Sequence, residues 1–259
     1  YKRQFLHVEL TAGGLDTLPP DLESRQAYEI LEEEFPAFTA SVVPLVIVFD
    51  EGQDPFSKAL STEVALVCEG VETVEGVISV SHPLCNPSLF DTEIEEWPED
   101  LRIEWLTTVS NSLAMINVPI EYPSGSDDAE QLIKDVREFT SSSQEEVLVG
   151  SWTSYEVDMK EHLKERIPVA LAFVLLVTMV LVWFQVHSVL VPIKAVFMNI
   201  LSISASFGLI VVVFQDGLLA GPLNFTPQPL DLMVPPLVFG IAFGLSMDYE
   251  VLMLSRIHE

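Results

Sequence analysis

Three long apolar runs in the second half of the chain constrain its fold more than any other feature. They cover residues 167–186, 189–214 and 232–254, and each holds about the 20 residues that a helix needs to cross a bilayer. Of the 39 acidic and 12 basic residues, 34 and 10 precede Ile167. We therefore predict an acidic domain over residues 1–160 and a membrane domain over residues 161–259 with three transmembrane helices.

The formal charge of −27 lies almost entirely in the acidic domain. Nucleic acids and anionic lipid surfaces bind clustered Lys and Arg, so the charge excludes nucleic acid as a partner of this part. The chain opens at Tyr1 and ends just past an apolar run, and we expect it to be part of a longer protein whose remaining spans are partners of these helices.

Basic residues in short loops predict the orientation, because positive charge next to membrane helices stays in the cytoplasm. His187 and Lys194 flank the first connection, and Arg256 follows the third run. Three basic residues within 160–166 argue the other way, but acidic residues are interleaved with them. We predict a multi-pass protein of the cytoplasmic membrane with its acidic domain outside the cytoplasm.

The acidic domain shows two β-α-β patterns in sequence. The spacing of apolar residues predicts a helix over 22–35 and then the first unit, with strands at 41–49 and 76–81 around a helix at 56–67. The second unit has a strand within 111–120, a helix over 129–139 and a strand at 146–149, and residues 93–106 remain unassigned. Two such units are typical of a ferredoxin-like α+β sandwich.

Cys68 and Cys85 both fall in the acidic domain. In an oxidising compartment they can form a disulfide, and otherwise they are two separate small apolar residues. His82 and Cys85 lack two further ligands at a recognisable spacing, so no metal site is predicted.

Asp248 lies inside the third apolar run. An ionised carboxylate within a membrane has a high free-energy cost, so such a residue usually has a function in moving protons or ions. Gly240, Gly244 and Asp248 recur every four residues and share one side of a helix, and small residues on such a face let a neighbouring helix approach. We predict that Asp248 carries a proton and that Gly240 and Gly244 pack against another helix. The alternative is a carboxylate held permanently by an Arg or Lys of another helix.

Five further polar residues in the apolar runs are candidates for a role beside this acid. Tyr249 is either a second relay group that donates a hydrogen bond or an aromatic packing residue, and Glu250 is either a second acid or a solvated charge at the membrane surface. On the second run, Asn199, Ser202 and Ser206 form a polar stripe that lines a relay or provides helix-to-helix hydrogen bonds.

Enzymatic motifs are absent from the sequence. It contains no glycine-rich loop ending in Lys-Ser or Lys-Thr, no Gly-x-Ser-x-Gly turn and no zinc-helix motif. We therefore predict a protein that is not an enzyme and uses the proton gradient without a cofactor.

Four stretches, at residues 20–36, 158–168, 188–202 and 244–259, resemble the mycobacterial membrane protein large (MMPL) branch of the resistance-nodulation-division (RND) transporters. The resemblance implies a twelve-span protein in two repeats, with this chain covering the porter domain and three spans of the second. It also implies that Asp248 and Tyr249 match the family's proton-relaying Asp-Tyr pair. His187 departs from the pattern, since relatives tend to carry Arg there.

The leading functional hypothesis is export of lipidic or amphipathic molecules across the membrane, driven by the proton-motive force. A sterol- or lipid-sensing membrane protein without transport is one alternative, and an extracytoplasmic assembly scaffold is another. The sequence identifies neither the substrate nor whether the protein is a monomer or a homo-oligomer.

Overall fold

The structure is a computed structural model of the 259-residue chain. It describes residues 8, 10–11, 18–19, 21–35, 41–50, 52–143, 145–186, 188 and 190–257, with side chains at all of these except 32, 185, 186 and 246–257. The chain forms two compact units, one of residues 27–157 and one of residues 1–26 together with 158–259. We call them the acidic unit and the helical unit.

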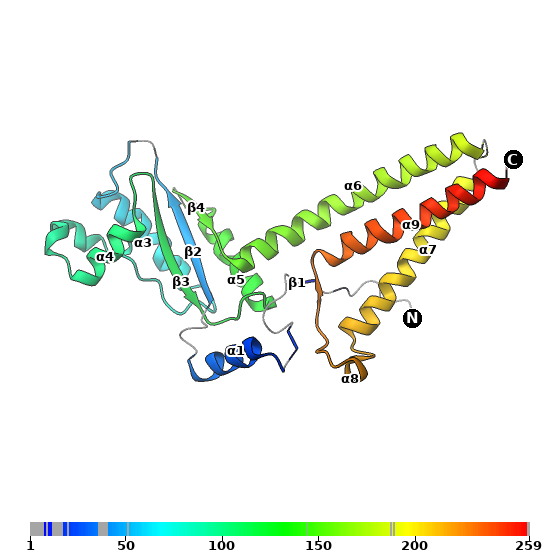
Figure 1. Ribbon diagram of the computed structural model, residues 1–259. Helices are drawn as coiled ribbons and strands as arrows, with labels where there is room; N and C mark the ends of the chain where they lie inside the picture. The colour runs from blue at the N-terminus through cyan, green and yellow to red at the C-terminus, as the bar shows by residue number, and fades with distance from the viewer. Residues whose placement is uncertain are drawn as a thin grey trace. The chain divides into compact units, whose positions relative to one another are not determined.

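Figure 1 shows the elements, which follow one another in this order: β1 (Leu10–Thr11), α1 (Glu23–Glu34), β2 (Ser41–Val48), α3 (Lys58–Glu72), α4 (Glu99–Thr108), β3 (Leu113–Ile120), α5 (Asp127–Thr140), β4 (Glu146–Val149), α6 (Trp152–Val186), α7 (Leu190–Ile210), α8 (Ala220–Leu223), β5 (Leu230–Asp231) and α9 (Val234–Ile257). Three short 3₁₀ turns, Pro83–Cys85, Pro87–Asp91 and Ile94–Glu96, lie between α3 and α4.

The acidic unit is built on a three-stranded antiparallel sheet in the order β3-β2-β4. In the central strand β2, Leu45 lies opposite Ile116 of β3 and Val149 of β4. Buried and more exposed residues alternate along β2 and β3, as expected when one face of a sheet is covered.

Helices α3 and α5 contact each other and share a core with the sheet. Both helices repeat apolar residues at helical spacing, which makes one apolar stripe on each. The core brings together Val43, Leu45 and Ile47 of β2, Ala114, Ile116, Val118 and Ile120 of β3, Leu60, Val64, Val67 and Val71 of α3, and Ala129, Leu132, Ile133 and Val136 of α5. Each fully buried Leu, Ile or Val contributes about 1.5–3 kcal/mol to folding.

The predicted strand at residues 76–81 is wrong. Only an isolated bridge joins Val77 to Ile120 at the free edge of β3. The run begins at Gly76, whose φ of +90° is not extended, and a Cβ at this position would lie 2.1 Å from the Tyr122 ring. A turn conformation available to glycine therefore replaces the start of the strand. The other predicted strands and helices of this half are confirmed within a few residues of their expected limits.

The segment between α3 and β3 contributes three aromatic rings to the core and its margin, and Phe56, just before α3, contributes a fourth. Phe56, Phe90, Trp97 and Trp105 pack in mutual contact, with ring centroids from 5.1 to 5.9 Å apart. Residues 93–106, unassigned from the sequence, supply a 3₁₀ turn and α4 to this cluster.

The two cysteines form a disulfide. It joins Cys68 of α3 to Cys85 of the first 3₁₀ turn, with the Cα atoms 5.8 Å apart. Of the two alternatives left open by the sequence, the disulfide is therefore the one observed.

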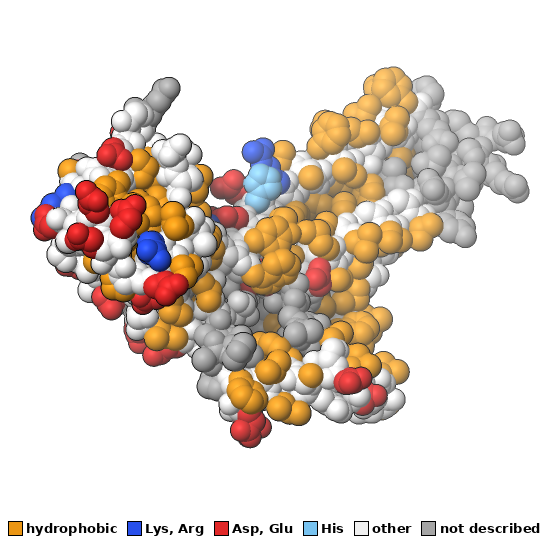
Figure 2. Space-filling view, turned by 60° about the vertical axis from the view of Figure 1, so that its left-hand side comes forward, with side chains coloured by type: hydrophobic (Ala, Val, Ile, Leu, Met, Phe, Trp, Pro, Cys, Tyr) orange, Lys and Arg blue, Asp and Glu red, His pale blue; other side chains and the backbone are white. Residues whose placement is uncertain are grey.

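The helical unit consists mainly of α6, α7 and α9. Pro192 and Pro235 lie in the first turns of α7 and α9, where the missing N–H has no helical partner to lose. The α7 helix continues into a π-helical turn, Val211–Gln215, and β5 then pairs in parallel with β1, placing Leu10 opposite Leu230. Figure 2 shows hydrophobic side chains over the long helices and many Asp and Glu side chains on the acidic unit.

Candidate functional site in the apolar helices

Helices α6 and α7 are long and apolar enough to cross a membrane. The most apolar window of 18 residues has a mean hydropathy of 2.7 within Trp152–Phe184 and of 2.3 within Leu190–Gln215. Only 11% and 22% of the most apolar windows are buried, so these are not core helices of a water-soluble domain. Large side chains such as Phe173 and Phe197 are exposed, as lipid-facing residues are.

The third apolar helix, α9, has 24 residues. Its described side chains end at Leu245, and the apolar part that they define, Val234–Leu245, is shorter than a span. The backbone of Asp248, Tyr249 and Glu250 continues this helix, and their side chains lie outside the described residues. The relay roles predicted for Asp248 and Tyr249 thus stay predictions, as do the roles of Glu250.

On α7, four residues form a buried stripe: Pro192, Ala195, Asn199 and Ile203. Asn199 is the polar member and is only 3% exposed. A buried amide in an apolar helix is costly unless it makes hydrogen bonds, so the Asn199 side chain requires polar partners around it.

The structure separates the two serines of the predicted polar stripe from Asn199. Ser202 and Ser206 are both exposed. The Ser206 hydroxyl donates a 3.1 Å hydrogen bond to the carbonyl oxygen of Ser202, one turn earlier on the same helix. This local bond satisfies the hydroxyl without a neighbouring helix. Of the three stripe residues, Asn199 alone is buried.

Gly240 and Gly244 are exposed on α9. Among the described residues, nothing lies within 4 Å of a Cβ built at either position. The described parts of α6 and α7 therefore do not pack on this glycine face. Its predicted contact with another helix stays a prediction that concerns a partner outside the described structure.

Helices α7 and α9 contact each other and run in opposite directions (Figure 1). Phe207 of α7 and both Pro235 and Phe239 of α9 line the same cavity, which places these residues within about a turn of the same level. Eight residues back along α7 is Asn199 and nine residues forward along α9 is Asp248, steps of roughly 12 and 13.5 Å at 1.5 Å per residue. The backbone of Asp248 thus comes to about the level of the buried Asn199.

The cavity itself was not anticipated from the sequence. It has a volume of about 200 Å³ between α6, α7 and α9, and its lining is apolar: Ile167, Ala170, Leu171, Val174, Phe207, Pro235, Pro236 and Phe239. It offers no hydrogen-bonding side chain, so it suits an apolar chain and not a proton path. The buried Thr178 of α6, 4% exposed, is a second polar residue that the sequence analysis passed over.

Within the described ranges, no group of three or more His, Cys, Asp or Glu side chains is placed to hold a metal ion.

Comparison with known proteins places these helices in a family. The model of the MMPL family matches residues 16–259, which is most of the chain. The chain belongs to the MMPL family. Together with its apolar helices, this makes it a membrane protein of the RND type.

Its relatives are named as exporters or membrane proteins. The trehalose monomycolate exporter MmpL3 of Mycolicibacterium smegmatis is 29% identical over 97% of this chain and 23% of its own length. The putative membrane protein SCO6666 of Streptomyces coelicolor is 30% identical over 97% of this chain and 30% of its own. The mycolic acid-containing lipids exporter MmpL11 of M. smegmatis is 30% identical over 84% and 21%. The chain thus spans between a fifth and a third of the length of these relatives.

Proposed function

We propose that this chain is part of a membrane exporter of lipidic or amphipathic molecules, driven by the proton-motive force, with Asp248 as the proton carrier. The observation that carries the proposal is the family match over residues 16–259, with relatives named as exporters of trehalose monomycolate and of mycolic acid-containing lipids. The exposed apolar surfaces of α6 and α7 fit a protein that works within lipid.

The proposed architecture has three membrane spans and a porter domain. At 24 residues, α9 is about 36 Å long, which exceeds the roughly 30 Å hydrocarbon core of a bilayer. In the acidic unit, β2 of the first βα unit lies between β3 and β4 of the second. Such interleaving supports a ferredoxin-like split β-α-β fold. The second strand of that fold, predicted at residues 76–81, is here reduced to the isolated bridge between Val77 and Ile120.

The acidic unit lies outside the cytoplasm in this proposal. The Cys68–Cys85 disulfide supports this, because disulfides persist in oxidising compartments. Labelling with a membrane-impermeant maleimide tests this orientation in whole cells that express variants with one added cysteine. Cysteine at Glu95, exposed in the acidic unit, should react directly, and cysteine at Ser188, between α6 and α7, should react only after permeabilisation. The reverse pattern would contradict the orientation.

Proton coupling rests on the cost of charge in the membrane. Protonation of Asp248 removes a charge whose burial is unfavourable, and this changes which helix packing is preferred. Each proton that crosses the membrane supplies about 2.3 kcal/mol per 100 mV, enough to shift a two-state equilibrium appreciably. The level of Asn199 on α7 makes it the candidate hydrogen-bonding neighbour of this carboxylate.

Export by the full-length parent protein in proteoliposomes tests the proposal. Asp248→Asn keeps the size of the side chain and removes its titration, so gradient-driven lipid export should fall to background. The matched control is Asp216→Asn, the same change at an exposed position after α7, and it should export at the parental rate. Parental export by Asp248→Asn would overturn the assignment.

A further inference from the structure

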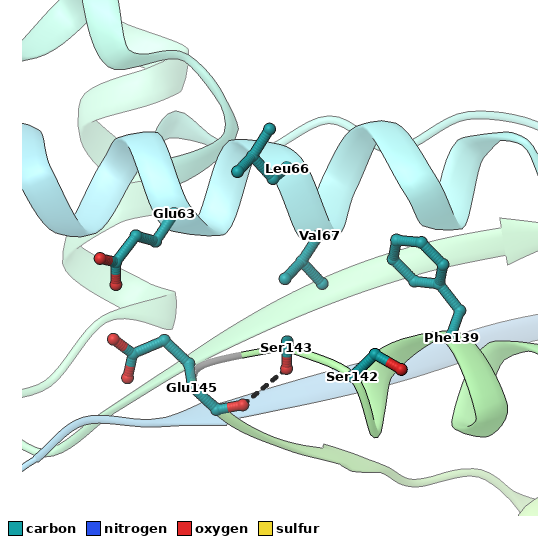
Figure 3. A pocket seen from close by; sticks show the side chains of 7 residues that line it. All are labelled: Glu63, Leu66, Val67, Phe139, Ser142, Ser143 and Glu145. Carbon is teal, nitrogen blue, oxygen red and sulfur yellow. Dashed lines mark hydrogen bonds between the residues drawn. The ribbon is translucent and has the colours of Figure 1, made fainter.

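A second cavity lies within the acidic unit and is lined by none of the residues of α6, α7 and α9. It has a volume of about 280 Å³ between α3 and the segment that joins α5 to β4. Its wall is apolar on one side, formed by Leu66 and Val67 of α3 and Phe139 of α5 (Figure 3). Close approach of the two helices here depends on Gly70, since a Cβ at that position would overlap the Phe139 ring.

The other end of this cavity is acidic. Glu63 of α3 and Glu145, just before β4, point their carboxyl groups toward each other (Figure 3). A hydrogen bond with Glu145 raises the pKa of Glu63, and desolvation and repulsion between the two charges raise it further. Gln53 donates a 3.0 Å hydrogen bond from Nε2 to Oε1 of Glu145, which holds this carboxyl in place.

Positive charge is missing from the cavity. Its lining contains Glu63 and Glu145 together with Leu66, Val67, Phe139, Ser142 and Ser143, and none of the residues described there is Lys, Arg or His. Two facing carboxyls without a cation disfavour full ionisation, and a cation between them would remove that cost. An anion would be repelled, and a neutral apolar molecule would gain no attraction from the two carboxyls.

The combination of an apolar wall and a carboxyl pair defines one class of ligand. We propose that this cavity binds an organic cation with an apolar body, with its protonated amine or quaternary ammonium between Glu63 and Glu145 and its alkyl or aryl part against Leu66, Val67 and Phe139. A divalent metal ion fits less well, because Ca²⁺ takes 6–8 oxygen ligands and most of this lining is carbon. The volume is at the low end of small-molecule sites, so the cavity takes a short amphiphile or one end of a longer one. This inference does not depend on transport.

Binding of hexyltrimethylammonium to the full-length parent protein in lipid nanodiscs tests the proposal, with empty nanodiscs as the blank. Isothermal titration should show saturable binding of the cation. Hexanoate should not bind, and 1-hexanol should bind at least about tenfold more weakly than the cation, because it carries no charge for the carboxylates to attract. Affinity should rise by about fourfold for each methylene added between the butyl and hexyl homologues.

Two double variants with the same change of net charge locate the site. Glu63→Gln with Glu145→Gln should weaken binding by about tenfold or more. Glu69→Gln with Glu72→Gln changes two exposed carboxylates on the same helix outside the cavity and should leave binding unchanged. Unchanged binding in the first variant, or equal weakening in both, would overturn the proposal, the latter by showing attraction to the acidic surface in general.

A third variant keeps the test decisive if the carboxyl variant fails to fold. Leu66 is 63% exposed, so Leu66→Gln removes apolar wall without emptying the core. It should flatten the dependence of affinity on alkyl chain length while the preference for cation over anion remains. An unaltered chain-length dependence would show that the apolar part binds elsewhere and would contradict the proposal.

Discussion

Replacement of His82 should make the acidic unit less sensitive to mild acid. His82 is 4% exposed, beside the disulfide-linked 3₁₀ turn. Its Nδ1 accepts a 3.1 Å hydrogen bond from the N–H of Leu84, which requires that nitrogen to be unprotonated, and its Nε2 is 2.8 Å from the Thr108 hydroxyl. Burial lowers the pKa of His82 from 6.5 to about 4.

The sign of the pH effect follows from proton binding. Between pH 4 and 6.5 the unfolded state binds a proton at this position and the folded state does not, so acid favours unfolding. The contribution of neutral His82 to the free energy of unfolding is fully present above pH 6.5, the pKa of His82 in the unfolded state. It is lost as the pH falls to about 4, the pKa of His82 in the folded protein. The whole difference corresponds to about 3 kcal/mol, and the part lost between pH 7 and pH 5 is about 2 kcal/mol.

His82→Asn isolates this contribution. Asn86, four residues on, precedes a proline as His82 does, and its Oδ1 accepts from the N–H of Ser88. Asn at position 82 can therefore cap its turn in the same way without titrating. Urea unfolding followed by tryptophan fluorescence at about pH 7 and pH 5 should show the parent losing about 2 kcal/mol more than the variant. Equal losses in the two proteins would show that protonation of His82 does not contribute to the acid sensitivity.

Three other changes have defined outcomes. Replacement of Cys68 and Cys85 by Ala opens a loop of 17 residues and should lower the free energy of unfolding by about 3 kcal/mol in urea titrations; a loss below about 0.5 kcal/mol would contradict this. Leu45→Ala removes a side chain that is 1% exposed at the centre of the sheet and should cost about 2–5 kcal/mol in the same assay. Asn199→Ala should slow proton-coupled export by the parent protein, and Ser206→Ala should leave it unchanged because that hydroxyl bonds within its own helix; equal effects would remove Asn199 from the relay.

Local patterns were enough to predict most elements of the acidic unit. The limits of β2, β3, α5 and β4 follow from alternation and helical spacing, because one covered face imposes these periods. The strand at residues 76–81 failed because an apolar run looks the same whether or not it has a partner strand along its length. The aromatic cluster was not visible either, since Phe56, Phe90 and Trp97 meet only through tertiary packing.

The candidate sites show a similar division. Spacing alone placed Asn199, Ser202 and Ser206 on one stripe. Ser206 lies only about 20° round the helix from Asn199 but two turns further along α7, so burial depends on what packs against the helix at each level, which spacing does not reveal. The carboxyl pair of Glu63 and Glu145 was invisible to sequence analysis, because its members are 82 positions apart and meet only when α3 packs on the α5–β4 segment.

Proton flux measured directly in proteoliposomes tests the central claim, with a pH-sensitive dye trapped inside and the lipid substrate supplied on one side. Substrate should drive proton movement through the parent protein, Asp248→Asn should abolish this movement, and Asp216→Asn should leave it unchanged. Substrate-driven proton movement that persists in Asp248→Asn would contradict the account.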